Sequence, residues 1–387
     1  MKTIKDVETF GKKVLVRVDF NVPLEDGEVA DDFRIRAALP TIRYLIDHQA
    51  RIILCSHLGR PKGKVVPELR LDPVADRLAH LLNKEVRKTD DCIGPKVEQA
   101  VKDLSPGEVL LLENTRFHPE EKANDADFAA LLAGLADLYV NDAFAAAHRA
   151  HASTEGVTHF LPAVAGLLMA SEVDTLTRML EEPEHPFLVV LGGAKISDKI
   201  GAVDKFLELA DTLLVGGGMA NTFLKARGLE MGESLVEENS LDQARRLLDR
   251  TGEHLVLPVD AVVADAFAAD AKRQTVAVDA VPAGWRILDV GPQTIELFKE
   301  KLAPARTVVW NGPLGVFEMA PFAAGTYALA RALARSEAVT ITGGGETAAA
   351  VYKAGVVEQM THVSTGGGAF LDFVEGKTLP GLAALAP

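Results

Sequence analysis

Two lysines and a group of arginines are the side chains of this sequence that are best suited to hold a phosphate. Lys195 and Lys199 follow the glycine turn at Gly192 and Gly193. The apolar run before the turn predicts a buried strand, and we expect the lysines on the opening turns of a helix that ends near Ala210. A glycine turn and a helix N-terminus after a buried strand form an anion site. Lysines in a first helical turn oppose the helix dipole by about 0.3–1 kcal/mol each. The pair therefore indicates a bound phosphate, unless both lysines are simply solvated.

Four arginines of the first half each lie in a loop or just after a strand-like run. They are Arg34, Arg60, Arg116 and Arg149. The guanidinium group is a planar fork that suits phosphate or carboxylate. One such arginine is usually a surface charge, but four of them projected with His57 from one edge of a sheet would form an anion pocket. Asp19 and Asn21 would suit a hydroxyl group of the same ligand.

Other polar residues allow more than one interpretation. Glu346 opens a helix after a glycine triplet, where a carboxylate either favours the helix terminus or holds Mg²⁺ directly or through water. Glu318 would accept from ribose hydroxyls or simply be exposed. His148 and His151 have a spacing that could bind a metal on a helix, but no third ligand lies nearby in the sequence, so His148 is interpreted as a pocket or packing residue.

The elements that must position these residues alternate along the whole chain. Amphipathic stretches, such as 39–48 and 239–250, separate strand-like apolar runs. The runs cover residues 14–20, 51–57, 109–114, 138–144, 187–191, 212–215, 255–264, 307–311, 338–342 and 362–364. This alternation predicts parallel sheets with helices on both faces. Ligands of such sheets bind beyond the carboxyl ends of the strands.

The two halves of the chain differ in the residues that come directly after the strands. In the first half the runs end in charged or hydrogen-bonding residues, and in the second half they end in glycine. The glycine turns are at 192–193, 216–218, 312, 343–345 and 366–368. Each turn alone could be a tight connection, but five at corresponding places favour a backbone cradle for polyphosphate. The two halves thus predict two sites, one for a small anionic metabolite and one for a nucleotide.

Length and composition limit the remaining possibilities. A chain of 387 residues favours two domains, with a boundary expected between Leu161 and Pro186 and a helix from Ala163 to Glu181 joining them. The net charge of −14 argues against a nucleic-acid partner. We expect no signal peptide and no membrane segment. Cys55 and Cys92 suggest neither a metal site nor a disulfide framework, which fits a cytoplasmic protein.

Over nearly its full length the sequence closely resembles the phosphoglycerate kinase family. The matching stretches are RVDFNVP from Arg17, SHLGRP from Ser56, ENTRF from Glu113, AHRA from Ala147, GGAKISDK from Gly192, WNGP from Trp310, GGGET from Gly343 and STGGGA from Ser364.

The resemblance implies reversible phosphoryl transfer between 1,3-bisphosphoglycerate and ADP, giving 3-phosphoglycerate and ATP with Mg²⁺. It implies that the triose is bound by Asp19, Phe20, Asn21, Arg34, His57, Leu58, Gly59, Arg60, Arg116 and Arg149. It assigns the nucleotide to Lys199, Glu318, Gly344, Gly345, Glu346 and Thr347, with Glu346 as the magnesium ligand, directly or through water. Arg34 and Lys195 would lie at the phosphoryl group in transit.

The family fold implies two doubly wound, Rossmann-like α/β domains that face each other across a hinged cleft, in a monomer. We expect a triose domain at residues 1–170, joined by the tail 372–387, and a nucleotide domain at 171–371. Two departures from the family pattern are Glu346, where many members have Asp, and Ile287, where glycine is frequent.

Two functions from other classes compete with this one. A nucleotide-binding dehydrogenase would need a G-x-G-x-x-G turn after a strand, and the nearest candidate has Asn221 in place of the third glycine. The tail from Leu371 to Thr378 is only a near miss to a Walker loop. A catalytically silent binding protein would have no need of Arg34, Lys195 and Lys199 together.

Overall fold

A computed structural model describes residues 1–386 of the chain, apart from the side chain at position 253, and it divides into two compact units. Unit 1 comprises Met1–Thr175 together with the segment from Gly376 onward, and unit 2 is Leu176–Glu375. The predicted boundaries, after residues 170 and 371, lie within a few residues of these divisions. The ligands expected for each domain stay predictions. In the described part of the chain, no helix is both long enough and apolar enough to cross a membrane.

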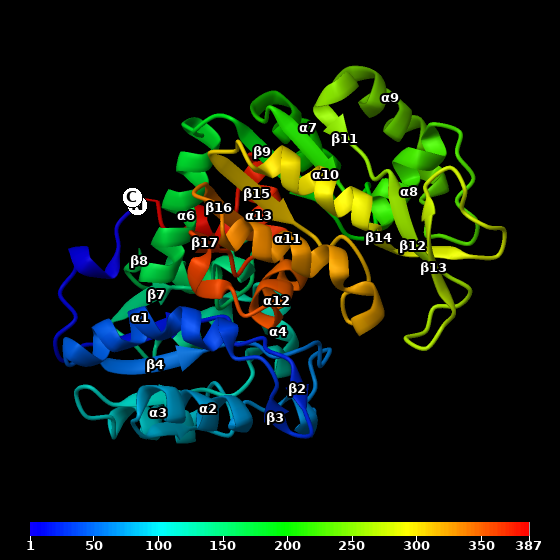
Figure 1. Ribbon diagram of the computed structural model, residues 1–387. Helices are drawn as coiled ribbons and strands as arrows, with labels where there is room; N and C mark the ends of the chain where they lie inside the picture. Colours follow the sequence, from blue (N-terminus) through cyan, green and yellow to red (C-terminus); the bar gives the residue numbers. More distant parts are fainter. Residues whose placement is uncertain (387) are drawn as a thin grey trace. The chain divides into compact units, whose positions relative to one another are not determined.

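Unit 1 is built on a six-stranded sheet in which every pair of neighbours is parallel (Figure 1). The order across the sheet is β5-β6-β4-β1-β7-β8. The strands are β1 (Lys13–Arg17), β4 (Arg51–Cys55), β5 (Val86–Lys88), β6 (Val109–Leu111), β7 (Leu138–Asn141) and β8 (Ala163–Ala165). A two-stranded hairpin, β2 (Leu24–Glu25) with β3 (Glu28–Val29), precedes the first helix.

Alternate residues of these strands pack on opposite faces of the sheet. Val14 and Val16 of β1 belong to one core cluster, whereas Leu15 belongs to another. Helices α1 and α2 cover the first face, and α3 and α5 cover the second. The helices of unit 1 are α1 (Phe33–Asp47), α2 (Asp72–Leu82), α3 (Pro95–Lys102), α4 (Pro119–Ala123), α5 (Ala126–Ala133) and α14 (Pro380–Ala383), and α6 (Leu167–Glu181) runs from unit 1 into unit 2. Apolar residues on both faces of a strand are typical of a sheet buried on both sides.

Unit 2 has a second six-stranded parallel sheet, in the order β11-β10-β9-β15-β16-β17. Its strands are β9 (Phe187–Leu191), β10 (Thr212–Val215), β11 (Leu255–Val256), β15 (Thr307–Asn311), β16 (Val339–Gly343) and β17 (His362–Val363). The chain builds outward from β9 to one side and then returns to build outward from β15 to the other. The crevice between β9 and β15 is therefore the point where a ligand is expected in a doubly wound sheet.

Helices also cover the sheet of unit 2. Residues of α10, α11 and α12 pack with Trp310 and Val308 on one face, and Phe206 of α7 contacts the ring of Phe187. The helices are α7 (Ile200–Leu209), α8 (Gly217–Ala226), α9 (Leu241–Thr251), α10 (Pro292–Leu302), α11 (Ala324–Ala334), α12 (Gly345–Lys353) and α13 (Gly368–Val374). The two parallel sheets with their helices confirm the predicted doubly wound α/β class.

A smaller antiparallel sheet in unit 2 was not predicted. It contains β12 (Asp260–Ala264) between β13 (Arg273–Ala277) and β14 (Arg286–Val290). The prediction of one strand over residues 255–264 was wrong, because β11 and β12 belong to different sheets. Pro258 lies between them and cannot donate to a strand ladder.

Two predicted helix starts were also wrong. The helix expected from Ala163 begins at Leu167, because Ala163–Ala165 pairs as β8 with β7. Helix α7 begins at Ile200, with Lys199 at its N-cap position, so Lys195 lies in the preceding loop. Hydrogen bonds from Ser197 to the Glu237 carboxylate hold this loop in a non-helical conformation.

Candidate active site

The polar residues of unit 1 follow three neighbouring strands of its sheet. Asp19 comes just after β1, His57 just after β4 and Arg116 a few residues after β6. Because these strands are parallel and adjacent, their carboxyl ends meet at one edge of the sheet. Arg34 reaches the same place from the first turn of α1. The edge gathers residues that lie far apart in the sequence.

Asp19 and Arg34 form the central ion pair of this edge. One guanidinium nitrogen of Arg34, Nη1, lies 3.2 Å from both carboxylate oxygens of Asp19 and also donates to the backbone oxygen of Asn21. The Asp19 side chain is buried, and Arg34 is about a quarter exposed. Burial alone would raise the pKa of Asp19, but the positive charges of Arg34 and Arg17 outweigh it and lower that pKa to about 2. The carboxylate is therefore ionised at neutral pH.

Two further contacts join the next strand ends to this pair. The Asn21 side-chain oxygen accepts from the backbone N–H of Gly59 at 2.8 Å, and the Gly59 carbonyl accepts from Arg116 Nη1 at 2.9 Å. Gly59 has a φ of +62°, and a Cβ there would press on Leu69. Burial and the positive charges of Arg17 and Arg149 lower the pKa of Arg116 to about 10, so it stays a cation near neutral pH.

His57 is buried at the same edge and contacts an arginine that was not predicted to belong to the site. Its Nδ1 lies 3.0 Å from Nη2 of Arg17, which is fully buried at the end of β1. Burial and the neighbouring arginines hold the pKa of His57 well below its usual value. The signal for Arg17 was a lone cation within an apolar strand.

The remaining residues assigned to the triose are not hydrogen-bonded into this cluster through their side chains. Phe20 and Leu58 are buried apolar side chains of the core. Arg60 is exposed, and its side chain makes no hydrogen bond or ion pair with the residues that the structure describes. Arg149 is also exposed and donates from Nε to Nε2 of His148. That contact occupies one of the two ring nitrogens of His148.

In unit 2 the corresponding edge carries mostly backbone. Lys199 Nζ donates to the carbonyl of Gly192 at 2.6 Å and to the carbonyl of Asn311 at 3.0 Å. These carbonyls lie at the ends of β9 and β15, where the strand order reverses. Burial lowers the pKa of Lys199 to about 8, although the carboxylates of Glu346 and Asp198 favour its charged form.

The glycine turns of this edge pack directly against one another. A Cβ at Gly192 would overlap the carbonyl oxygens of Pro313 and Gly312. A Cβ at Gly217 would lie 2.7 Å from the carbonyl oxygen of Gly193, and one at Gly312 would lie 2.4 Å from the carbonyl oxygen of Gly192. Real side chains essentially never approach this closely, so at these three positions the turns require glycine.

The other residues assigned to the nucleotide lie around α12 and the loop after β15. Gly344 has a φ of +100° and precedes α12, in which Gly345 and Glu346 are exposed first-turn residues. Thr347 is fully buried, and its hydroxyl accepts from the backbone N–H of Gly312 at 2.7 Å. Glu318 and Lys195 are exposed, and their side chains make no hydrogen bond or ion pair within residues 1–386.

Glu237 was not predicted from the sequence, yet it anchors the loop that carries Lys195. Its carboxylate accepts from the backbone N–H and from the hydroxyl of Ser197. These bonds lower the pKa of Glu237 against the opposing effect of its burial. No sequence signal marks this contact, because Glu237 lies 40 residues from Ser197.

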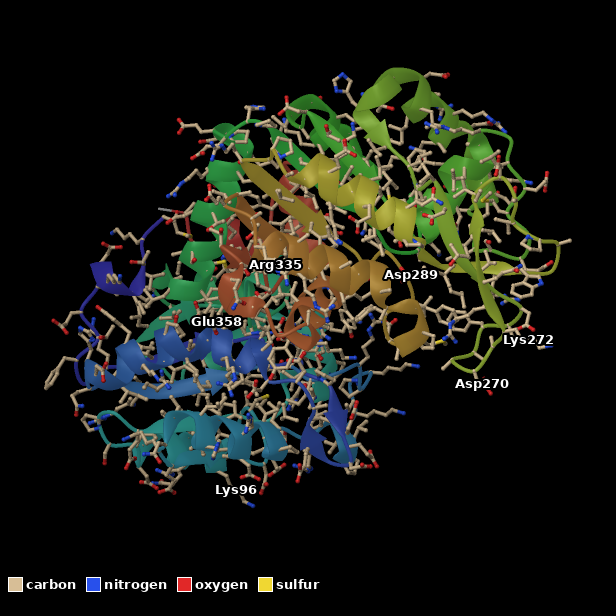
Figure 2. All side chains as sticks on the ribbon, viewed as in Figure 1. Lys96, Asp270, Lys272, Asp289, Arg335 and Glu358 are labelled. Atoms are coloured by element: carbon tan, nitrogen blue, oxygen red, sulfur yellow. The ribbon has the colours of Figure 1, made fainter. Side chains whose placement is uncertain are left out.

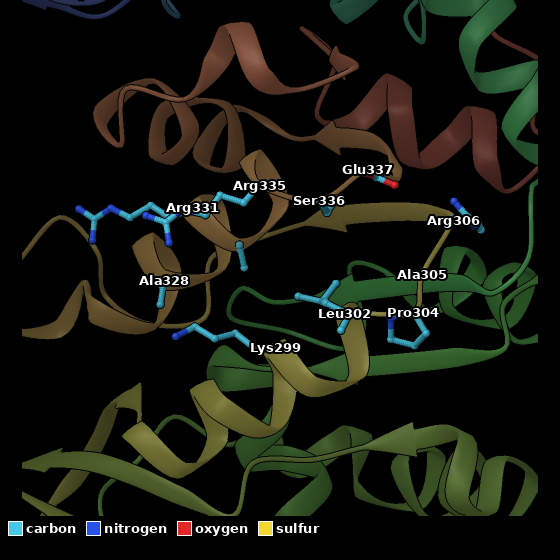
Figure 3. A pocket seen from close by; sticks show the side chains of 12 residues that line it. Lys299, Leu302, Pro304, Ala305, Arg306, Ala328, Arg331, Arg335, Ser336 and Glu337 are labelled. Atoms are coloured by element: carbon cyan, nitrogen blue, oxygen red, sulfur yellow. The ribbon is translucent and has the colours of Figure 1, made fainter.

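Figure 3 shows a surface cavity of about 740 Å³ in unit 2, which is lined by none of the residues assigned to either site. Lys299 of α10, Arg331 of α11 and Arg335 just after α11 line it, together with Arg306 just before β15. Arg306 marks the amino end of the strand whose carboxyl end carries the glycine turn. Cations in the last turn of a helix are favourable without any ligand, so this cavity gives no reason to move the candidate site.

Among the described side chains one cluster has metal-ligand geometry, formed by Asp91, Cys92 and His118. Internal hydrogen bonds already explain it. Asp91 Oδ1 accepts from the backbone N–H of Cys92 and lies 2.7 Å from Nε2 of His118, and burial raises the pKa of the Cys92 thiol well above its usual value.

Comparisons with known proteins identify the family of the chain. The family model described as phosphoglycerate kinase matches residues 4–377. A phosphoglycerate kinase of Moorella thermoacetica is 61% identical over 386 residues, covering 99% of this chain and 98% of the relative. One of Chloroflexus aggregans is 59% identical over 393 residues, with the same coverage.

Solved structures of phosphoglycerate kinases also match the chain. The phosphoglycerate kinase of Coxiella burnetii matches with a TM-score of 0.83 and 44% identity, covering 99% of this chain and 98% of that one. The enzyme of Pyrococcus horikoshii OT3 matches with a TM-score of 0.90 and 35% identity, covering 100% and 98%. The chain belongs to the phosphoglycerate kinase family.

Proposed function

We propose that this chain transfers a phosphoryl group between a triose held by unit 1 and a nucleotide held by unit 2. As a phosphoglycerate kinase it is a phosphotransferase of glycolysis with a carboxyl group as acceptor, and it interconverts 1,3-bisphosphoglycerate and ADP with 3-phosphoglycerate and ATP. The observation that supports assigning the triose to unit 1 and the nucleotide to unit 2 is the contrast between the two sheet edges. Charged side chains gather at one, and Lys199 lies among glycine turns at the other.

The triose suits the first edge because its anionic groups need several cations. Arg34 and Arg116 would bind its phosphate or carboxylate, with Arg60 and Arg149 at the exposed rim. Asp19 stays ionised and would accept from the hydroxyl group while holding Arg34 in place. Leu58 and Phe20 would contribute backbone and packing, since their side chains are buried in the core.

The nucleotide phosphates suit the second edge because bare N–H groups and one buried lysine surround it. Lys199 would bind a phosphate, and the turn at Gly344 and Gly345 would present N–H groups at the start of α12. Thr347 would hold the Gly312 backbone in position. Glu318 would accept from the ribose.

The chemistry requires no general base. In the ATP-consuming direction the nucleophile is a carboxylate, which is already ionised at neutral pH. What the transfer needs is positive charge around the phosphoryl oxygens and reactants held in line. We assign that charge to Arg34 and Lys195. Because the Lys195 side chain is exposed and has no partner among the described residues, it could move with the phosphoryl group during transfer.

The residues also fit a magnesium ion. Glu346 is an exposed carboxylate whose charge acts on Lys199, so it lies near the place where nucleotide phosphates would bind. An oxygen ligand of this kind suits Mg²⁺, directly or through water. Bound there, the ion would neutralise charge on the nucleotide phosphates.

A direct assay tests the proposed function. The protein is incubated with 3-phosphoglycerate, ATP and Mg²⁺, and the acyl phosphate is trapped with hydroxylamine as a hydroxamate. We expect a product that depends on both substrates and on the metal. Oxidation or reduction of a nicotinamide cofactor instead would favour a dehydrogenase, and absence of any turnover would favour a silent binding protein.

Direct transfer also requires both ligands to reach one another, so we expect the protein to become more compact when both are bound. Small-angle scattering of the free and doubly liganded protein measures this. An unchanged radius of gyration would contradict it. Light scattering would test the expected monomer.

A further inference from the structure

A fully buried arginine, Arg17, is the last residue of β1, at the sheet edge of unit 1 that carries Asp19, Arg34 and His57. Arg17 has no exposed surface, although it is one of the largest buried side chains of the protein. Among the side chains that the structure describes, no carboxylate forms a direct ion pair with it. A buried charge is strongly unfavourable unless it is compensated by hydrogen bonds and an opposite charge.

Besides the charge of nearby Asp19, a second carboxylate is joined to Arg17 by hydrogen bonds through a serine hydroxyl. Arg17 Nε donates to Ser153 Oγ at 2.8 Å, and Ser153 Oγ donates to Glu121 Oε1 at 2.6 Å. The other oxygen of Glu121 accepts from the backbone N–H of Ser153 at 2.9 Å. Ser153 and Glu121 are fully buried as well. One hydroxyl proton is available, so accepting from Arg17 forces Ser153 to donate to Glu121.

The third contact of Arg17 fixes the protonation of His57. Nη1 donates to the backbone oxygen of Val18, and Nη2 lies 3.0 Å from Nδ1 of His57. A guanidinium group can only donate, so Nδ1 must be the acceptor and a neutral His57 must carry its proton on Nε2. Among the described residues Nε2 has no hydrogen-bond partner.

We propose that Glu121 and Ser153 are positioning residues that act through Arg17 to hold His57 as the Nε2–H tautomer, aimed as a donor at an anionic oxygen of the triose. The choice of ligand rests on the proposed function, whereas the tautomer rests on the hydrogen bonds alone. Positioning through a chain of buried bonds suits a neutral histidine, because a neutral ring offers one donor and only the correct tautomer offers it to the ligand.

The simpler alternative is that this chain of bonds only stabilises the fold. A purely structural role predicts that its loss lowers stability and leaves the tautomer of His57 and the affinity for triose unchanged in the molecules that remain folded. The two ideas therefore differ in quantities that can be measured on folded protein.

Nitrogen-15 NMR of the full chain, labelled at histidine, reads the tautomer directly. The signal of His57 is assigned by its loss in His57→Gln. We expect the wild type to carry the proton on Nε2 from pH 6 to pH 8. A proton on Nδ1, or a doubly protonated ring at pH 7, overturns the proposal without any variant.

Two variants test the chain of bonds. Ser153→Ala removes the bridging hydroxyl, and Glu121→Gln removes the buried charge while keeping its shape. We expect each to mix the tautomers of His57 and to raise KM for 3-phosphoglycerate about tenfold, with KM for ATP and kcat changed less than about twofold. An unchanged tautomer in either folded variant overturns the proposal.

The matched control is Glu120→Gln. Glu120 is the exposed neighbour of Glu121 in α4, so the substitution makes the same change of charge at the surface. It should leave the tautomer and both KM values unchanged. If the wild type shows the expected tautomer but has no activity on 3-phosphoglycerate, the proposed function fails and the positioning chain stands.

Discussion

The carboxyl edges of the two parallel sheets offer different groups to an anionic ligand. In unit 1 the edge consists of side chains that hold one another, as Arg34 holds Asp19 and Arg116 holds the carbonyl of Gly59. In unit 2 it consists of backbone turns that touch, with Lys199 placed on two strand-end carbonyls.

The difference lies in the changes that each edge can tolerate. A site made of side chains depends on charge, so its function can be altered while its fold is kept. A site made of backbone depends on the absence of side chains, so altering it disturbs the packing as well. Substitutions at the two edges should therefore change different properties of the protein.

The largest effect should come from adding one methyl group to the backbone edge. In Gly192→Ala the new Cβ would overlap two carbonyl oxygens of the loop after β15, neither of which can rotate away. We expect the free energy of unfolding to fall by roughly 3 kcal/mol and the activity to be lost with it. Urea denaturation measures the free energy of unfolding.

Gly345→Ala is the control for this substitution. Position 345 has open space around it and lies in the first turn of α12. Its unfolding free energy should change by less than about 1 kcal/mol. Equal destabilisation by both variants would show that close packing of the turns is not the cause.

Removing a charge from the side-chain edge should act on the chemistry instead. For Arg34→Ala we expect kcat to fall at least about 100-fold, because Arg34 is assigned to the phosphoryl group in the transition state. Steady-state kinetics in both directions would measure it. A rise in KM at unchanged kcat would reassign Arg34 to ground-state binding.

The two edges should also differ in their response to pH. Lys199 has a pKa of about 8 in the free protein, and its charged form binds phosphate. Deprotonation above pH 8 should therefore weaken ADP binding by up to about tenfold per pH unit. Binding of 3-phosphoglycerate should stay constant from pH 7 to pH 9, since the pKa values of Asp19 and Arg116, about 2 and about 10, lie outside this window.

Calorimetric titrations at several pH values would distinguish the two ligands. Lys199→Ala should bind ADP weakly and lose the dependence on pH, whereas Lys195→Ala should keep it. A flat profile for ADP in the wild type would remove Lys199 from the phosphate site.

A smaller effect concerns one buried carboxyl group in each unit. Asp142 accepts from the first N–H groups of α6, and Asp289, labelled in Figure 2, accepts from the N–H of Gly325 in α11. Burial raises the pKa of both to about 7. Because the folded protein holds these protons more tightly, their stabilising contribution is complete below about pH 4 and is lost as the pH rises through 7.

We therefore expect the unfolding free energy to fall by about 1 kcal/mol per pH unit for each group between pH 5 and pH 7. Asp142→Asn and Asp289→Asn should each flatten this slope. Denaturation curves at three pH values would measure it, and slopes identical to wild type would contradict the burial effect.

The smallest effect should come from a charge that belongs to neither edge. Arg331 lines the cavity of Figure 3 and lies in the last turn of α11. Arg331→Ala should change stability by less than about 0.5 kcal/mol and leave every kinetic constant unchanged. A raised KM would give that cavity a part in the reaction.

The sequence predicted the parts of this fold that carry a strong pattern. The strands Phe187–Leu191, Thr212–Val215 and Thr307–Asn311 begin and end as expected, because each is a short apolar run that ends at a polar or glycine residue. The exposed strand β13 was missed, since its sequence RQTVA lacks an apolar run, and β5 and β8 were missed as edge strands of only three residues each. Edge strands leave a weak signal because only part of their surface is buried.

The candidate site was predictable at positions where the residue type allows few structural or chemical roles. Glycine at a strand end and arginine after a strand both limit what the position can do. Arg17 was not assigned, because its meaning depends on Ser153, which lies 136 residues away in the chain. The roles of Arg60, Lys195 and Glu318 remain predictions about the ligand-bound protein, because their side chains have no partner among the described residues.

The chain returns to unit 1 after completing unit 2, and this has a consequence for its synthesis. The backbone N–H of Gly381 donates to the carbonyl of Ala147, and the Gly381 carbonyl accepts from the side chain of Asn141, the last residue of β7. Unit 2 is one continuous segment and could fold as it leaves the ribosome. Unit 1 is assembled from two separate segments, so the hydrogen bonds of Gly381 to Ala147 and Asn141 can form only after all of unit 2 has been synthesised.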